Sequence, residues 1–542
     1  MRRLIPGLIG LLSIGLAAPR EARACGCFVP PDPKSPVVQA GERIVFAIKN
    51  NEVTAHIQIQ YTGDAKQFGW ILPLPSLPTM EVGTDELFNT LVQKTNPDYN
   101  LDRHFAENCY RAPSIGCASY SAGGAVPREA GNGADAGVTN PLVIMDSVGP
   151  YDYAVLKADD KTAMLDWLKA NNYFVPAATD TVVAQYVHPG AYFLALKLRS
   201  GKSTGDLQPV IVHYSSDLPM IPIVLTSVTA VPDMGIQVWV LGAARAIPRN
   251  YHHVVINQAA LDWSNGATNY GKVLIDAVKS APGKHAFITE FAGDTAVMKG
   301  VLNPTGRFGD LDKLKTYNDP IAFVGYVRNH QFGAYPFTGV LRGVMSTCIP
   351  EPAELQKDGV AAEEFASKPD TYLMSWKQAY PNAMPITFDP VACTGELDKR
   401  IVKPTVASNQ LFSDYKWVTR FYTALSPEDM TVDPVFSFNA DLPEVKLTHT
   451  LLMEYDCDRN GTLTTEEGFR IPYPRSLAPP MLPSLPAALR IETVRETGAP
   501  MVLTDNTKDI KAALGQSDSG GGCHVDSRPS RGRHAPFIAG LV

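Results

Sequence analysis

The residues whose types and spacing most clearly suggest chemistry form the segment DCDRNGTLTTEE at positions 456–467. A helix–loop–helix calcium site takes its oxygen ligands from alternate positions of a loop of about twelve residues, with a glycine at the centre and a closing glutamate. Gly461 stands at the glycine position, and Leu463 stands where such loops carry an apolar anchor. The ligands would be Asp456, Asp458, Asn460, Thr462, Thr464 and Glu467. The pattern predicts a calcium ion with a stabilising role rather than a catalytic one.

The same residues also fit a metal-free interpretation. The segment that enters the loop is strand-like, and Gly468 and Pro472 would stop an exit helix early. Asn460–Gly461 then makes a turn, and Thr464 with Glu467 forms a capping box for one helical turn. Against this interpretation, five carboxylates crowd around a single arginine between residues 454 and 467, and a cation would offset their repulsion. Both interpretations stay open.

Few other residues form a recognisable catalytic pattern. The sequence has no GxSxG, HExxH or phosphate-binding glycine loop. Glu290 and Asp294 fit a pair of carboxylates for glycosidic chemistry, but they fit a solvated strand end equally well. His252 and His253 are adjacent, so on a strand they point to opposite faces and cannot bind one ion together.

The eight cysteines bear on the redox compartment. An even number of cysteines in an exported protein favours disulfides. Cys109 with Cys117 would close a short loop, and Cys348 with Cys393 is the next candidate pair. A metal site is the alternative, but no CxxC pair is present.

The N-terminus has the pattern of a signal peptide. Arg2 and Arg3 precede the apolar run LIPGLIGLLSIGLAA, and Ala22-Arg23-Ala24 offers small residues at a cleavage site. We therefore predict that residues 1–24 are a signal peptide and that the mature chain resides in the periplasm, at the cell surface or outside the cell. No later apolar run is long enough to span a bilayer.

Composition narrows the classes of partner. The net charge is −7 over 542 residues, which argues against nucleic acid because phosphate binding needs a dense Lys/Arg face. Hydrophobic residues make up 45% of the chain, enough for large buried cores. The 42 glycines and 44 prolines indicate many turns between short strands.

Local patterns predict a mixture of strands and helices. Residues 43–61 alternate like a hairpin that turns at Asn50–Asn51, and His56 falls on its polar face, which predicts an exposed side chain. Residues 84–95 and 269–281 have helical periodicity, whereas IPIVLTSVTA at 221–230 is strand-like. These elements predict an α+β fold with a β-rich, mostly antiparallel twisted sheet, packed helices and a smaller β-rich C-terminal domain.

Six motifs carry a family resemblance: ACGCFVPP, QAGERIVFAI, VTAHIQIQYTGDAKQFGWILPLPS, YAVLKADD, ALDWSNGATNYGKVLIDAV and FITEFAGD. Together they make residues 25–345 resemble domain-of-unknown-function family 2330, a group of secreted bacterial proteins. The resemblance implies export and a single family domain. It implies no known activity and assigns no catalytic residue.

The predicted domain organisation follows from these boundaries. The family domain covers residues 25–345 with a flexible insertion at about 113–141. A β-rich C-terminal domain, residues 346–515, contains the loop at 456–467, and residues 516–542 form a flexible Gly/Ser and basic tail. Attachment to the cell envelope through Cys523 in this tail is one possible role for it.

Two functional hypotheses remain at this point. The first is an exported, non-enzymatic cell-envelope or extracellular protein, with calcium as a candidate stabilising ion. The second is a secreted hydrolase whose site is assembled from residues far apart in sequence. A deep pocket with carboxylates or a hydroxyl–histidine contact would favour the second hypothesis.

Overall fold

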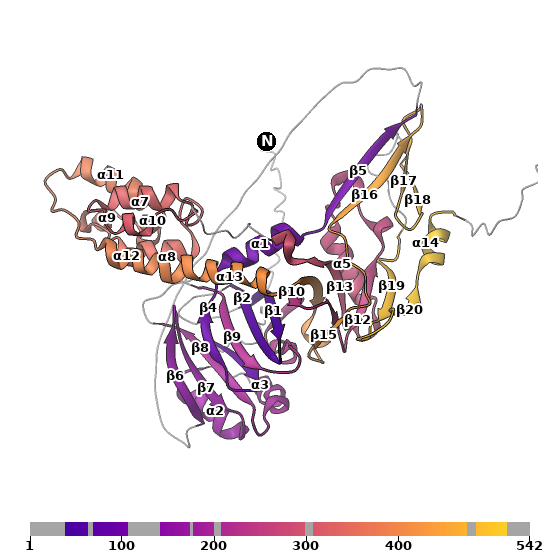
Figure 1. Cartoon of the computed structure of the whole chain (residues 1–542), viewed down its shortest axis with the longest axis horizontal. Coiled ribbons are helices and arrows are strands. Elements are labelled where there is room, and N and C mark those ends of the chain that lie inside the picture. The colour runs from indigo at the N-terminus through magenta and orange to yellow at the C-terminus, as the bar shows by residue number, and fades with distance from the viewer. Residues whose placement is uncertain are drawn as a thin grey trace, which may run out of the picture.

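A computed structural model describes residues 38–62, 69–106, 141–173, 177–199, 207–298, 307–473 and 484–516 (Figure 1). The predicted signal peptide, Cys109 and Cys117 lie outside these ranges, as do nearly all of the predicted insertion and tail. None of the helices in the described ranges is both long enough and apolar enough to cross a membrane.

A ten-stranded mixed sheet forms the centre of the molecule. Its neighbours are antiparallel except for two parallel pairs, β1 with β10 and β12 with β13. The strands follow one another in the order β20 (Met501–Asp505), β19 (Ala488–Thr493), β12 (His252–Ile256), β13 (Ala286–Asp294), β14 (Trp417–Leu425), β10 (Ala230–Gly242), β1 (Val38–Lys49), β2 (Glu52–Thr62), β9 (Val210–Ser215) and β4 (Thr79–Val82).

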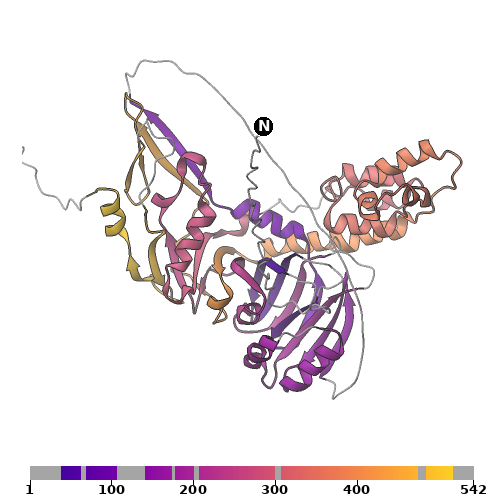
Figure 2. The same ribbon diagram turned by 180° about the vertical axis from the view of Figure 1, so that it is seen from behind.

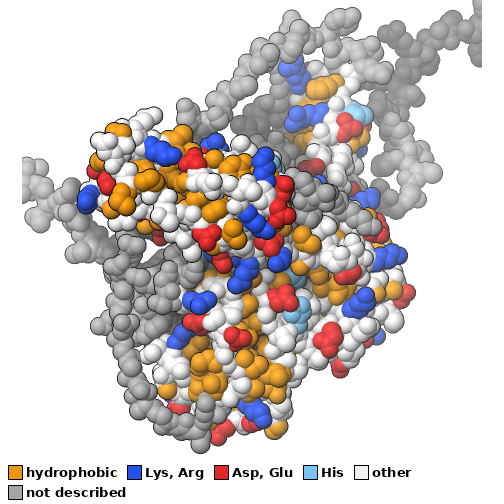
Figure 3. Space-filling view, turned by 60° about the vertical axis from the view of Figure 1, so that its left-hand side comes forward, with side chains coloured by type: hydrophobic (Ala, Val, Ile, Leu, Met, Phe, Trp, Pro, Cys, Tyr) orange, Lys and Arg blue, Asp and Glu red, His pale blue; other side chains and the backbone are white. Residues whose placement is uncertain are grey.

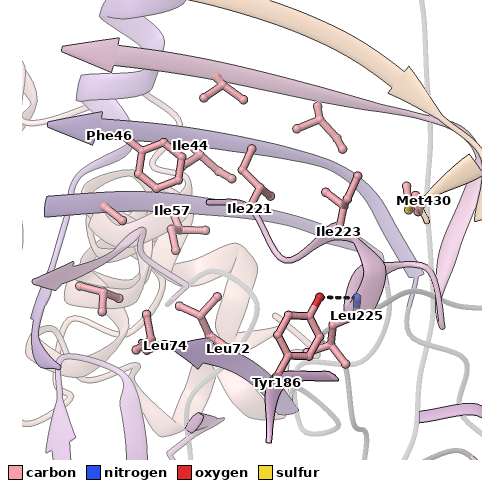
Figure 4. Packing of buried hydrophobic residues seen from close by; sticks show 14 of the residues in the cluster. Ile44, Phe46, Ile57, Leu72, Leu74, Tyr186, Ile221, Ile223, Leu225 and Met430 are labelled. Atoms are coloured by element: carbon pink, nitrogen blue, oxygen red, sulfur yellow. Dashed lines mark hydrogen bonds between the residues drawn. The ribbon is translucent and has the colours of Figure 1, made fainter. Parts of the chain in front are cut away.

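A second, antiparallel sheet packs against one end of this sheet. Its order is β3 (Gly69–Leu74), β8 (Tyr192–Leu198), β7 (Tyr151–Lys157) and β6 (Leu142–Val148). Leu72 and Leu74 of β3 face Ile44, Phe46 and Ile57 of β1 and β2 in one apolar cluster (Figure 4). The helices α2 (Lys161–Ala170) and α3 (Ala177–Val183) lie beside this second sheet (Figure 1).

The opposite face of the main sheet is covered by α1 (Asp85–Thr95) and α13 (Lys403–Asp414). Phe88 of α1 and Phe412 of α13 pack with Trp239 of β10 in a separate apolar cluster. The coverage of this face by helices explains why the His56 side chain is 3% exposed, whereas the sequence predicted an exposed side chain. Alternation placed it on the face opposite Ile57, but α1 covers that face, where Gln58 donates a hydrogen bond to Asp85.

Residues 307–414 form a helical part with its own apolar core, seen at one end of the molecule in Figures 1 and 2. Before α13 it contains α6 (Leu311–Leu314), α7 (Pro320–Asn329), α8 (Gly339–Cys348), α9 (Ala353–Lys357), α10 (Ala362–Ser367), α11 (Pro369–Ala379) and α12 (Pro390–Leu397). Acidic and basic side chains are mixed over it in Figure 3. Its helices are short and three begin at proline, so no single one gives a long periodic signal.

This helical part changes the predicted domain organisation. The predicted boundary after residue 345 falls inside α8, and the first part of the predicted β-rich C-terminal domain is helical. Strand β14 then returns to the main sheet between β13 and β10, so strands from both sides of that boundary share one sheet. The helical part is an insertion between two neighbouring strands of the sheet.

The remaining C-terminal strands form a smaller β-rich region. A four-stranded sheet has the order β18 (Arg470–Tyr473), β17 (Gly461–Thr464), β16 (Thr448–Tyr455) and β5 (Asp98–Phe105). A two-stranded ladder joins β11 (Arg245–Pro248) to β15 (Phe436–Asn439). The helices α5 (Tyr270–Lys279) and α14 (Thr507–Ala513) complete this end of the molecule.

The structure confirms the predicted α+β class with its mostly antiparallel sheet. The hairpin turn is confirmed as well: Asn50 and Asn51 have φ of 54° and 62°, as a two-residue turn between twisted strands requires. The segment predicted as a strand at 221–230 is different, because residues Ile223–Thr226 form the short helix α4.

A buried ion pair joins the elements near β14. Arg420 Nε lies 2.7 Å from Glu290 Oε2, and both side chains are almost inaccessible to solvent. Tyr270 donates to the other oxygen of Glu290 at 2.7 Å, and Arg420 Nη2 donates to Asn96 Oδ1 at 3.0 Å. The pair therefore connects β13, β14, α5 and the end of α1.

We expect Arg420→Met to lower the free energy of unfolding by about 3–5 kcal/mol, because it leaves the Glu290 carboxylate buried without its cation. The control is Lys272→Met, which removes an exposed ion pair with Asp276 and should cost less than about 1 kcal/mol. Urea denaturation measures both. Equal losses in the two variants would contradict the structural role given to the buried pair.

Candidate functional site

The predicted calcium loop begins as a tight hairpin turn rather than a helix–loop–helix. Tyr455 pairs with Gly461, so β16 and β17 run antiparallel on either side of residues 456–460. Asp456 accepts hydrogen bonds from the backbone N–H of Asn460 at 2.8 Å and from its side-chain amide at 3.0 Å. These hydrogen bonds lower the pKa of Asp456. Two of the predicted ligands thus contact each other.

The remaining predicted ligands follow β17 away from that turn. Thr462 and Thr464 lie on β17, and Glu467 lies in the next turn, where Gly468 donates to the Thr465 carbonyl. A strand advances about 3.3 Å per residue, so Asp456 and Glu467 stand at opposite ends of β17. The structure does not bring the six predicted ligands together, and calcium binding stays a prediction.

The cysteines in the described ranges have two different states. Cys457, in the same hairpin turn, is disulfide-bonded. Cys348 of α8 and Cys393 of α12 are free thiols, and their side chains are in hydrogen-bonding contact. The predicted pairing of these two cysteines therefore joins residues that are neighbours in the fold. The pairing of Cys109 with Cys117 lies outside the described residues.

The two carboxylates considered for glycosidic chemistry are not a catalytic pair. Glu290 is buried and occupied by Arg420 and Tyr270. Asp294 is exposed at the end of β13, where it accepts a hydrogen bond from the backbone N–H of Ala296 at 2.7 Å. One carboxylate is structural, and the other caps a turn.

A cavity of about 340 Å³ lies between the main sheet and the second sheet. Its walls come from β1, β2 and β3, the residues around Tyr186, and the segments 214–222 and 433. Figure 4 shows the apolar side chains of both sheets and of residues 221–225 that face one another here. The lining residues are Glu42, Ile44, Phe46, Ala55, Ile57, Leu72, Pro73, Leu74, Pro75, Gln185, Tyr186, His188, Ala191, Tyr214, Ser216, Leu218, Met220, Ile221, Pro222 and Asp433.

Glu42 is the unusual member of this lining. Strand alternation on β1 places it on the same face as Ile44 and Phe46, and it is 5% exposed. Its Oε2 atom has no hydrogen-bond partner. Burial raises the pKa of Glu42 from 4.5 to about 7. A buried carboxyl oxygen without a partner is costly, which makes this position a candidate for binding.

Asp433 is the second carboxyl in the lining, and its oxygens are already occupied. The backbone N–H of Val224 donates to Oδ1 at 2.9 Å, and the Tyr186 hydroxyl donates to Oδ2 at 2.7 Å. Burial raises the pKa of Asp433, while these two hydrogen bonds act in the opposite direction. Asp433 therefore fixes Tyr186 and α4 at the wall of the cavity.

A second arrangement of chemical interest lies elsewhere on the main sheet. His253 Nδ1 is 3.1 Å from Glu492 Oε2, and His253 Nε2 is 3.0 Å from Thr289 Oγ1. Burial lowers the pKa of His253, which favours a neutral ring that can accept a proton from the hydroxyl. The order hydroxyl, imidazole, carboxylate is that of a catalytic triad.

Sequence reasoning did not identify Glu42, His253 and Thr289 as candidate site residues. Glu42 had one local signal, an acidic residue in phase with Ile44 and Phe46 on a strand. His253 and Thr289 had none, because β12, β13 and β19 are brought together only by the sheet. Among the described residues, no group of three or more His, Cys, Asp or Glu side chains is placed to hold a metal ion.

The fold and the cavity together describe an α+β protein with a small-molecule-sized space between two sheets. The chain belongs to the family described as "Uncharacterized protein conserved in bacteria (DUF2330)", which matches residues 19–389. The predicted resemblance is thereby confirmed. No curated protein and no solved structure matches the chain.

The family match includes both the cavity strands β1 to β3 and most of the helical part, and it ends before β14. Glu42 and all but Asp433 of the cavity lining lie inside the matched range.

Asp456→Ala should lower the melting temperature in EDTA, because it removes two hydrogen bonds worth about 1 kcal/mol each in the hairpin turn. Asp458→Ala is the matched control, since it deletes a neighbouring carboxylate outside those bonds. A calcium site would behave differently. Millimolar calcium would raise the wild-type melting temperature, and both variants would lose that rise. An unchanged melting temperature in calcium would remove the predicted site.

Glu42→Gln should stabilise the protein increasingly as pH rises. The folded protein holds the Glu42 proton up to about pH 7, whereas the unfolded chain releases it near 4.5. Between these values the folded state binds more protons, so the free energy of unfolding falls with rising pH, by about 3 kcal/mol over the window. Glu42→Gln has no carboxyl to ionise, so its free energy of unfolding does not fall in this way.

Urea denaturation between pH 4.5 and 8 measures the difference between variant and wild type. The exposed control Glu496→Gln should show no such trend. A difference for Glu42→Gln that stays constant with pH would show that this carboxyl is not held protonated by burial.

Proposed function

We propose that the protein is an exported, non-enzymatic protein of the bacterial envelope or extracellular space that binds an apolar small molecule in the cavity between its two sheets. The observation that carries the proposal is this cavity of about 340 Å³, with apolar walls and one buried carboxyl oxygen that lacks a partner. Ligand sites in proteins are of about this size, mostly apolar, and contain few polar groups that fix the orientation of the ligand.

The walls of the cavity are preformed. Ile44, Phe46 and Ile57 stand on two long strands of the main sheet, and Leu72 and Leu74 stand on β3 of the second sheet. Side chains on paired strands lose little further freedom when a ligand binds, which keeps the entropic cost of binding low. The apolar area of such a ligand leaves water on binding, and this supplies the favourable free energy.

Export rests on the signal-peptide pattern of residues 1–24. The disulfide at Cys457 supports it, because disulfides persist in oxidising compartments. Cys348 and Cys393 are free thiols in hydrogen-bonding contact, and this contact supports the proposal that they form a disulfide in such a compartment. A calcium ion at residues 456–467 would add a structural role in the same setting.

The test uses the neutral apolar dye N-phenyl-1-naphthylamine, whose fluorescence rises in apolar surroundings. The wild-type protein should bind the dye, and Ala55→Leu should weaken binding by about tenfold or more, because the added methyl groups occupy the cavity. Ala379→Leu, on the exposed end of α11, is the matched control and should bind like the wild type. Equal dye binding by Ala55→Leu would overturn the proposed site.

A second candidate function is hydrolysis, and one observation favours it: the Thr289–His253–Glu492 arrangement. In this reaction the Thr289 oxygen would attack an ester carbonyl while His253 takes the hydroxyl proton. His253 would then return the proton to the departing alkoxide, and a water molecule deprotonated by His253 would cleave the Thr289 ester, releasing the acid and restoring the hydroxyl. The side chains of His253 and Glu492 are 9% and 7% exposed, so Thr289 is the more accessible member.

Labelling with a fluorophosphonate probe tests the hydrolase candidate. Labelling of Thr289, detected by mass spectrometry and lost in His253→Gln, would establish an activated hydroxyl. An unlabelled Thr289 in the folded wild-type protein would remove the hydrolase candidate and leave His253 as a buried, hydrogen-bonded residue of the sheet.

A further inference from the structure

The polar groups of the cavity indicate what chemistry its ligand carries. The titratable lining groups are Glu42 of β1, Asp433, Tyr186, His188 and Tyr214. Among the described residues that line the cavity, there are two carboxyls and no lysine or arginine. An anionic ligand would meet no fixed positive charge, whereas a cationic group would complement the carboxyls.

The two carboxyls are not equally available. Asp433 accepts hydrogen bonds from Val224 and Tyr186, so each of its carboxylate oxygens already has a donor from the protein. Glu42 Oε2 lacks a partner although the side chain is 95% buried, since its exposed fraction is 5%. Glu42 is therefore the group that a ligand can satisfy.

The remainder of the lining near Glu42 is apolar. Ile44 and Phe46 continue its face along β1, and Ala55 and Ile57 lie on the adjacent strand β2. A ligand with one donor at Glu42 and a hydrocarbon body along these residues would use both properties of the cavity.

We propose that the ligand is an amphiphilic amine, whose protonated nitrogen donates to Glu42 while its hydrocarbon chain fills the space between the two sheets. This inference rests on the proposed binding function and specifies the ligand class of the same site. Charge-assisted hydrogen bonds of this kind are about twice as strong as neutral ones, and burial from water strengthens them further.

The affinity of the cavity for a protonated amine should rise with pH. Below pH 7, Glu42 is mostly protonated because its pKa is about 7, and binding of a cation must release that proton. Octylamine remains protonated throughout pH 6–8. Its affinity should therefore rise about tenfold between pH 6 and 8, in proportion to the ionised fraction of Glu42.

The experiment compares three ligands of equal chain length by isothermal titration calorimetry: octylamine, octanol and octanoate. At pH 8 octylamine should bind at least about tenfold more tightly than either of the others. Glu42→Gln should reduce the affinity for octylamine to about that for octanol and leave octanol unchanged. Asp312→Asn removes an exposed carboxylate in the helical part and should change nothing.

The outcomes separate this inference from the proposed function. If octanol binds as tightly as octylamine, the cavity holds apolar molecules but recognises no amine, and only the inference fails. Octanoate as the tightest ligand would also overturn it. If none of the three binds and the dye does not bind either, the proposed function fails as well. An octylamine affinity that does not change between pH 6 and 8 would exclude Glu42 as its partner.

Discussion

The ion pair between Arg420 and Glu290 is the interaction that the arrangement of the chain depends on. Both side chains are buried, and a buried charge without its partner is strongly destabilising. Arg420 lies on β14, which the chain reaches only after the whole helical part, and Glu290 lies on β13 before it. The two residues meet because β14 inserts between β13 and β10. Arg420 also contacts Asn96 at the end of α1, so one side chain links the strand that follows the helical part to the N-terminal region.

This constraint also shapes the cavity. With β14 in place, β10 is paired on both sides, and its other neighbour β1 is held in a parallel register that sets Glu42 beside Ile236. Glu42 cannot turn to solvent without the strand leaving the sheet. A single β1–β2 hairpin would relax around such a carboxyl, whereas a ten-stranded sheet does not. The folded state thus retains the loss of stability that the buried Glu42 carboxyl causes, about 3 kcal/mol at neutral pH. Such losses are typical of sites where function opposes stability.

The sequence predicted the features that are set by neighbouring residues. Asn50–Asn51 specifies its own turn, and the helical periodicity of residues 84–95 is that of α1, Asp85–Thr95. The calcium pattern shows the limit of such local reasoning. Residues 456–467 have the composition of a metal loop, but β16 pairs in parallel with β5, more than 300 residues earlier. That pairing makes the entering segment a strand and divides the loop between two hairpin turns. The cavity position of Glu42 and the His253 cluster, formed by Thr289, His253 and Glu492, depend in the same way on pairing between distant strands.

Comparison of the buried polar groups distinguishes structural residues from candidates for binding. Glu290 has a cation and a tyrosine hydroxyl, and His253 has a carboxylate on one nitrogen and a hydroxyl on the other. Each of these groups would lose hydrogen bonds if a ligand displaced its partners. Glu42 would gain one, because its Oε2 has none and the residue lines a space large enough for a small molecule. A ligand donor at Glu42 would satisfy a carboxyl oxygen that folding leaves without a partner. A ligand at Glu290 or His253 would instead displace hydrogen bonds that the protein already makes. For this reason the cavity, and not the better-connected His253 cluster, is the stronger candidate for the site at which the protein acts.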